Sequence, residues 1–173
     1  MQALEFWKAV TLDRTDFLER LIHLLENAHV RFCVVGGIAV NAYAEPVVTL
    51  DLDLAVAVPD LERAESLLRP EFEVHRFPHS VNVAAEDSKL RVQLQTDPRY
   101  FPFVERAEPR EVLGLTLPVA NIEDVLRGKI WAFQDPQRRA SKRQKDLADI
   151  ARLLEARPSL RSVVPAEILS RLV

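Results

Sequence analysis

Two aspartates one residue apart, Asp51 and Asp53, interrupt an apolar stretch of the sequence and could hold a positively charged ligand. Side chains two residues apart on a strand point the same way, with Cα atoms about 6.5 to 7 Å apart, so both carboxylates would face one side. Carboxylate oxygens in that arrangement suit a hard divalent cation, Mg²⁺ or Mn²⁺. The alternative is a solvated strand edge, because unpaired charge is costly inside a core.

Two adjacent glycines, Gly36 and Gly37, precede the aspartates by a short segment. Glycine has no Cβ, so the backbone there can approach a phosphate chain closely. A helix that begins at this point directs its free N–H groups and the positive end of its dipole toward the same place. Glycines and aspartates together predict a site where a triphosphate and a cation meet, although a Gly-Gly pair alone is also typical of an ordinary turn.

Hydrophobic periodicity predicts the elements that must position these residues. Residues 31–35 predict a short strand that stops at the glycines, followed by a helix that Pro46 ends. Alternation of apolar residues with aspartate over residues 50–56 predicts a second strand, and residues 89–96 predict a third. The third strand has an apolar face of Leu90, Val92 and Leu94 and a polar face of Arg91, Gln93 and Gln95.

Further elements flank this centre. An amphipathic helix is expected within residues 15–30, with Thr15 or Asp16 as its cap. Residues 98–118 are punctuated by prolines and predict irregular chain with one edge strand near residues 115–119. The other expected elements are a helix over 60–68, strands over 73–77 and 80–85, and helices over 121–133, capped by Asn121, and about 141–156.

Composition predicts one compact α+β (mixed α/β) unit, with a core over residues 1–118 and a helical segment over 119–173. The 173 residues are 48% hydrophobic and 28% charged, with a net charge of −3. No run approaches the roughly 20 apolar residues of a membrane helix. The first residues lack the basic and then apolar order of a signal peptide, so we expect a cytoplasmic protein without a membrane contact.

The two helices after residue 118 carry several charged residues. Lys129 borders the apolar stripe of the first helix, so its ammonium either reaches inward to a triphosphate or extends to the surface. In the second helix, four-residue spacing pairs Lys142 with Asp146 and Lys145 with Asp149, which predicts a salt-bridged solvent face. A basic cluster consists of Arg138, Arg139, Lys142 and Arg143. It either binds a polyanion such as an RNA end or is solvated at the surface.

The order strand, Gly-Gly, helix, Thr49 and Asp-x-Asp strand resembles the opening of the nucleotidyltransferase superfamily, which has the DNA polymerase β-like fold. The stretch GGIAVNAYAEPVVTLDLDLAV is similar to the AbiEii toxin-like branch. GKIWAF and RRASKRQKDLADIARLL resemble the lysine helix and the Lys-Asp helix of such toxins. The resemblance covers about residues 30–156 and implies a small mixed sheet flanked by helices and followed by a helical tail.

This resemblance implies an enzyme that moves a nucleoside monophosphate from an NTP to an acceptor hydroxyl and releases pyrophosphate. It implies that Asp51 and Asp53 bind the metal ion and that Asp146 is a candidate acid or base. Catalytic roles would fall to Asp51, Asp53, Lys129 and Asp146. Nucleotide contacts would come from Gly36, Gly37, Thr49, Gln93, Gln95, Lys129 and Lys145.

The third strand departs from the family pattern. Many relatives carry a third acidic residue there, whereas the polar positions of this chain are Arg91, Gln93 and Gln95. A neutral amide neither supplies the missing charge nor acts as a general base. Three functions therefore stay open: transfer to an RNA or tRNA 3′ end by a toxin with a cognate antitoxin, nucleotide or partner binding by a degenerate member, and nucleotidylation of a small antibiotic.

Overall fold

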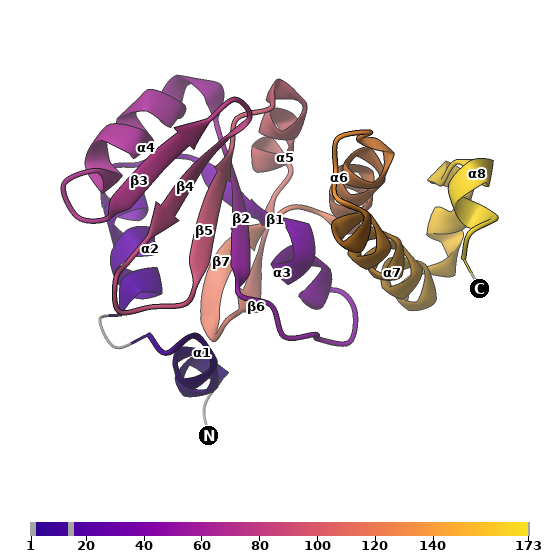
Figure 1. Ribbon diagram of the computed structural model, residues 1–173, viewed down its shortest axis with the longest axis horizontal. Coiled ribbons are helices and arrows are strands. Elements are labelled where there is room, and N and C mark those ends of the chain that lie inside the picture. Colours follow the sequence, from indigo (N-terminus) through magenta and orange to yellow (C-terminus); the bar gives the residue numbers. More distant parts are fainter. Residues whose placement is uncertain (1–2, 14–15, 173) are drawn as a thin grey trace.

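The computed structural model describes residues 3–13 and 16–172 and contains a seven-stranded mixed sheet in the order β3-β4-β5-β2-β1-β7-β6 (Figure 1). β2 pairs parallel with β5 and β1 pairs parallel with β7, while the other neighbouring strands are antiparallel. This architecture confirms the expected mixed α/β class. The strands are β1 (Phe32–Val35), β2 (Asp51–Val56), β3 (Glu73–Phe77), β4 (Ser80–Ala84), β5 (Arg91–Gln95), β6 (Glu108–Val112) and β7 (Leu115–Val119).

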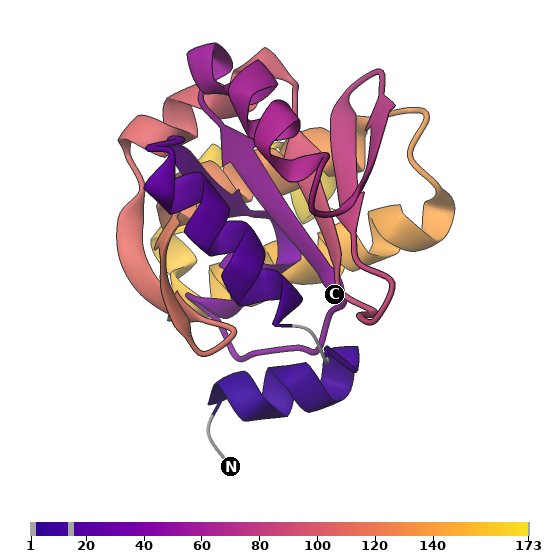
Figure 2. The same ribbon diagram turned by 90° about the vertical axis from the view of Figure 1, so that its left-hand side faces the viewer.

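Helices cover both faces of this sheet (Figures 1 and 2). α2 and α4 lie on one face, and α3 lies on the other face with α6 and α7 beyond it. None of the helices in the described part of the chain is long and apolar enough to cross a membrane. The α-helices are α1 (Ala3–Thr11), α2 (Phe17–Asn27), α3 (Gly36–Asn41), α4 (Leu61–Leu68), α5 (Phe101–Glu105), α6 (Ile122–Gln134), α7 (Ala140–Ala156) and α8 (Ala166–Leu169), and 3₁₀ turns occupy Val58–Asp60, Pro98–Tyr100 and Pro158–Val163.

The central strands form the core and orient the two aspartates. β1 is buried along its whole length. In β2, Leu52 and Leu54 are fully buried, whereas Asp51 and Asp53 on the opposite side are partly exposed. The predicted alternation is therefore confirmed, because burying the leucines forces both aspartates onto the other face.

Several local predictions differ from the structure. The strand predicted at a sheet edge near residues 115–119 is internal, because β7 pairs with both β1 and β6. Residues 98–118 are more ordered than expected, because Pro102 occupies the first turn of α5 and Pro109 lies on the edge strand β6, where a missing N–H is tolerated. The helix after the glycines ends at Asn41 rather than near Pro46. The Asn41 side chain exchanges hydrogen bonds with the backbone of Val47, at 2.8 and 3.0 Å, and so organises the next loop.

The predicted cap of α2 is also different. Thr15 lies outside the described residues, and Asp16 occupies the cap position without a side-chain capping bond. Instead, the carboxylate of Asp13 accepts hydrogen bonds from the backbone N–H groups of Phe17 and Leu18, at 3.0 and 3.5 Å. α1 was not predicted from the sequence.

Candidate active site

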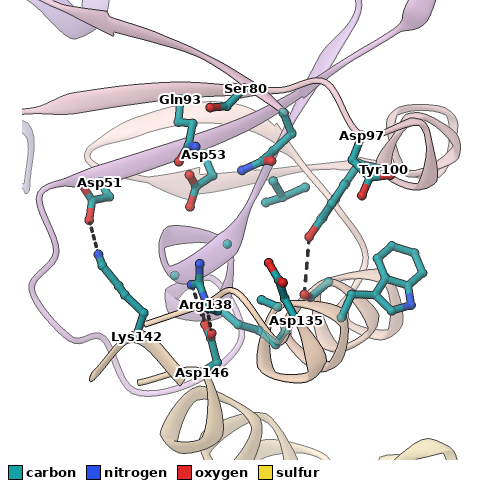
Figure 3. Close-up of a pocket in the computed structure, with 18 of the residues that line it drawn as sticks. Asp51, Asp53, Ser80, Gln93, Asp97, Tyr100, Asp135, Arg138, Lys142 and Asp146 are labelled. Atoms are coloured by element: carbon teal, nitrogen blue, oxygen red, sulfur yellow. Dashed lines mark hydrogen bonds and ion pairs between the residues drawn. The ribbon is translucent and has the colours of Figure 1, made fainter. Parts of the chain in front are cut away.

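A cavity of about 820 Å³ lies between the polar face of β2 and β5 and the helices α3, α6 and α7 (Figure 3). It brings together residues that are more than 100 positions apart in the chain. Of the predicted site residues, Arg143 alone does not line the cavity. Its Nε instead donates to the carbonyl oxygen of Phe133. The predicted residues that do line it are Gly36, Gly37, Thr49, Asp51, Asp53, Gln93, Gln95, Lys129, Arg138, Arg139, Lys142, Lys145 and Asp146.

The carboxylate of Asp53 lies directly against Gly36. A Cβ atom at Gly36 would be 2.2 Å from Oδ2 of Asp53, and Gly36 has a φ of +71°, which favours glycine. Asp53 forms no hydrogen bond or ion pair with the other described residues. Burial raises the pKa of Asp53 above its usual range, although the charge of Lys129 opposes that shift. Its oxygens are therefore free for a cationic ligand.

Asp51 has a different environment, because both of its oxygens already face cations. Oδ1 accepts a hydrogen bond from Nε of Arg91 at 2.7 Å, and Oδ2 accepts one from Nζ of Lys142 at 3.4 Å (Figure 3 shows the second contact). The parallel register places Arg91 beside Asp51 and Gln93 beside Asp53. The two aspartates are thus unequal, one paired and the other free.

Lys129 is buried at the interface of α6 and α7, with only 6% of its surface exposed. Its Nζ lies 3.2 Å from Oδ1 of Asp146 and 2.7 Å from Oδ2 of Asp149. Arg138 pairs with Asp146 through Nε at 2.5 Å and Nη2 at 3.1 Å. The interpretation of Lys129 as a surface lysine is therefore wrong, and so are the salt bridges predicted within α7, since both aspartates point inward to α6.

Asp149 is a member of this cluster that the sequence analysis assigned to the solvent face. Its Oδ1 also accepts a hydrogen bond from Nη1 of Arg152 at 2.8 Å. Arg152 then donates through Nη2 to Oδ1 of Asn41 at 2.8 Å and to the carbonyl oxygen of Glu45. The buried charges of α7 are thereby tied to the loop before β2. The signal that could have identified Asp149 was its spacing of three from Asp146, which places both on one helix face.

The loop before β2 also reaches the cavity through Thr49. Nζ of Lys145 donates to Oγ1 of Thr49 at 3.3 Å. A Cβ atom at Gly37 would be 3.8 Å from the same Nζ, so Lys145 lies above the glycine turn. An ammonium in this position suits a phosphate group bound against the backbone of Gly36 and Gly37.

Aromatic side chains form the far wall of the cavity. The Trp131 ring is stacked on Phe103, with centroids 5.6 Å apart, and Tyr100 meets Trp131 edge-on at 5.5 Å. The guanidinium of Arg99 lies 4.7 Å from the centre of the Trp131 ring. Trp131 was missed as a cavity residue, because nothing in its local sequence distinguishes a cavity wall from ordinary core packing.

The donor set suits one hard divalent cation. Asp53 offers free oxygens, Asp51 lies two residues away on the same face, and the amide of Gln93 adds a neutral oxygen beside Asp53. Among the described residues, no group of three or more His, Cys, Asp or Glu side chains is arranged to hold a metal ion. The acidic ligands therefore match a single ion shared with phosphate oxygens better than a fully protein-bound pair of ions.

Substitution of Gly36 tests the contact with Asp53. Gly36→Ala should displace the Asp53 carboxylate and weaken Mg²⁺-dependent NTP binding, at a stability cost of about 1–2 kcal/mol for the left-handed backbone. Gly114→Ala is the matched control, since Gly114 also has a positive φ, +79°, and its Cβ would meet Leu4 outside the cavity. Titration calorimetry with Mg²⁺ and NTP measures both variants, and equal losses of affinity would contradict the assigned geometry.

The family described as "Nucleotidyl transferase AbiEii toxin, Type IV TA system" matches residues 74–171, which include Lys129, Lys145 and Asp146 but begin after Asp53. No curated protein matches the sequence.

Among solved structures, ANT(2")-Ia in complex with adenylyl-2"-tobramycin has a TM-score of 0.55 at 12% identity, with 85% of this chain and 96% of that chain covered. An antigenic nucleotidyltransferase-like protein from Paracoccidioides brasiliensis has a TM-score of 0.52 at 17% identity, with 86% of this chain and 75% of that chain covered. At these identities the similarity is one of fold.

Proposed function

We propose that this chain, a nucleotidyltransferase of the AbiEii family, binds an NTP with Mg²⁺ or Mn²⁺ in its cavity. It transfers the nucleoside monophosphate to an RNA hydroxyl, with a tRNA 3′ end as the preferred acceptor. The observation that carries this proposal is the free carboxylate of Asp53 against Gly36, beside Asp51 and opposite the cationic side chains of α6 and α7. We further propose that the protein acts in the cytoplasm as a toxin with a cognate antitoxin.

The reaction is an in-line displacement at the α-phosphorus. The acceptor oxygen forms a new bond to that phosphorus, the bond to the bridging oxygen of the β-phosphate breaks, and pyrophosphate leaves with that electron pair. A divalent cation held by Asp51 and Asp53 would supply charge neutralisation at the triphosphate. The hydroxyl proton passes to water, because both oxygens of Asp146 are already engaged by Lys129 and Arg138.

The side chains of α6 and α7 hold the triphosphate and the acceptor in this proposal. Lys145 above Gly37 contacts phosphate oxygens, and Lys129 contributes a buried positive charge behind them. Asp146 acts as a positioning residue that fixes Lys129 and Arg138, rather than as the acid or base suggested by the resemblance. Arg139 is exposed at the cavity and is available for an acceptor phosphate.

The charge of the cavity favours a polyanionic acceptor over a cationic antibiotic. Seven Lys or Arg side chains and six Asp side chains of the described chain line it. Three of the aspartates, Asp51, Asp124 and Asp146, are engaged in ion pairs with at least two cations each. Few carboxylates therefore remain to hold an aminoglycoside, whereas an RNA backbone would find cationic partners.

A transfer assay tests the proposal. The protein is incubated with Mg²⁺, each α-labelled NTP in turn, and total tRNA, and parallel reactions contain an aminoglycoside or a lincosamide instead of RNA. We expect label in RNA from the unmodified chain and none from Asp53→Asn. Label on the antibiotic alone would show that the acceptor is an antibiotic and not RNA. NTP binding without transfer to any acceptor would show that the chain is a degenerate member that binds nucleotide without turnover.

A further inference from the structure

Strand β5 brings a cation, not a carboxylate, to the metal-binding face of β2. In the parallel register, Arg91 stands beside Asp51, Gln93 beside Asp53 and Gln95 beside Ala55. A second divalent cation at two carboxylates needs a further anionic ligand to balance its charge. The neighbouring strand supplies two neutral amides and a guanidinium, so the protein offers no acidic ligand from β5.

Arg91 and Lys142 compete with metal ions for Asp51 from two different elements. The Arg91 contact to Oδ1 is the shorter, at 2.7 Å, and the Lys142 contact to Oδ2 is 3.4 Å long. Lys142 is on α7, on the opposite side of the cavity from β2 (Figure 3). A cation held by Asp53 and Asp51 would compete with the weaker Lys142 contact, whereas the shorter Arg91 contact to Oδ1 would be retained.

Arg91 is also equipped to contact phosphate oxygens. Its Nε is the one side-chain nitrogen with a hydrogen-bond partner among the described residues, and its side chain is 68% exposed at the cavity. The two Nη groups can donate to a triphosphate while Nε stays on Asp51, because the guanidinium presents its donors in a rigid fork. A guanidinium in this place combines a carboxylate contact with positive charge toward phosphate, as a second metal ion would.

We propose that Arg91 takes the place of a second divalent cation, so that the site binds one ion per nucleotide, between Asp53 and Oδ2 of Asp51. The proposal rests on the proposed nucleotide binding at this cavity. It makes Arg91 a phosphate-contacting residue and Lys142 a side chain that leaves Asp51 when the ion enters. It also accounts for binding of the triphosphate at a site to which β5 brings no carboxylate.

Counting bound Mn²⁺ by electron paramagnetic resonance tests this directly. The protein, in excess over the nucleotide, is titrated with Mn²⁺ in the presence of an α,β-methylene analogue of each NTP. The analogue binds but cannot donate its nucleoside monophosphate. We expect one Mn²⁺ per nucleotide complex in the unmodified chain and two in the double variant Arg91→Ala, Gln93→Asp. Two ions in the unmodified chain, no protein-dependent ion, or one ion in the double variant would overturn the proposal.

Single variants separate the charge of Arg91 from a structural role. Arg91→Ala should tighten binding of the one Mn²⁺ about tenfold, since Asp51 loses a competing cation, and should weaken binding of the nucleotide analogue measured without metal. Arg91→Lys should restore much of the nucleotide affinity. Arg76→Ala is the matched control, because Arg76 is a strand arginine paired with Glu65 outside the cavity. If Arg76→Ala changes Mn²⁺ affinity as much as Arg91→Ala does, the proposal fails.

The number of bound Mn²⁺ ions does not depend on whether the chain transfers a nucleoside monophosphate. The analogue cannot donate its nucleoside monophosphate, so the Mn²⁺ count is the same whether or not the chain modifies RNA. A count of one with no transfer in the assay above would leave the inference standing and defeat the proposed activity, whereas a count of two with transfer would do the reverse.

Discussion

Asp53→Asn should abolish transfer and at the same time make the metal-free protein more stable. Loss of a charged ligand at the triphosphate removes several kcal/mol of charge stabilisation, so we expect transfer to fall about 10³-fold or more. The substitution conserves the size of the side chain, so its contact with Gly36 is retained. Label transfer to RNA at saturating Mg²⁺ measures the loss.

The gain in stability follows from the direction of the pKa shift. Burial raises the pKa of Asp53 in the folded chain above its usual value of 3.8, so the unfolded chain loses this proton at lower pH than the folded chain does. Above the raised pKa, the ionised carboxylate therefore opposes folding. The asparagine variant should be more stable at neutral pH, and the difference should vanish as the pH falls below 3.8, where both states hold the proton.

Asp60→Asn provides the matched control, because its shift has the opposite sign. Hydrogen bonds from the backbone and side chain of Arg31 hold the pKa of Asp60 below its usual range, and Arg63 adds a further contact. This variant should lose stability at neutral pH. Thermal unfolding in the presence of a chelator, followed from neutral to acidic pH, measures both. A lower melting temperature for Asp53→Asn at neutral pH would contradict an unpaired, partly buried carboxylate at this position.

Lys129→Ala should cause a large loss of stability. The side chains of Lys129 and its two partners Asp146 and Asp149 are exposed by 7%, 1% and 5%. Removing the ammonium leaves carboxylates buried with fewer cations, which costs about 3–5 kcal/mol. The free energy of unfolding is measured by urea denaturation.

Lys142→Ala is the control for this experiment. Its side chain is 36% exposed and makes a single contact with Asp51, at 3.4 Å, so its loss should cost less than about 1 kcal/mol. Lys129→Ala protein that remains folded at low temperature should also bind NTP more weakly than the Lys142 variant does in the absence of metal. Similar urea midpoints for the two variants would show that Lys129 does not balance the buried aspartates.

Much of the fold was predictable because it follows from local backbone geometry. The period-two alternation of β2 and β5 fixed which side chains share a face, and capping by Asn121 was confirmed by its hydrogen bond to the N–H of Asp124 at 2.9 Å. α5 and β6 were missed because prolines usually interrupt elements, and only the position of Pro102 in a first helical turn and of Pro109 on a sheet edge makes them compatible with order.

The sequence by itself therefore determined the faces of the strands, the glycine turn against which a phosphate could lie, and part of the cavity lining, in which Trp131 was not predicted. Only the tertiary structure decided how the charges pair. Lys129 meets Asp146 and Asp149, and Lys142 meets Asp51 from 91 positions away in the chain. Periodicity fixes the direction of a side chain relative to its own element, whereas its partner depends on how α6 and α7 pack against α3 and β2. That packing left Asp53 free and Asp51 paired.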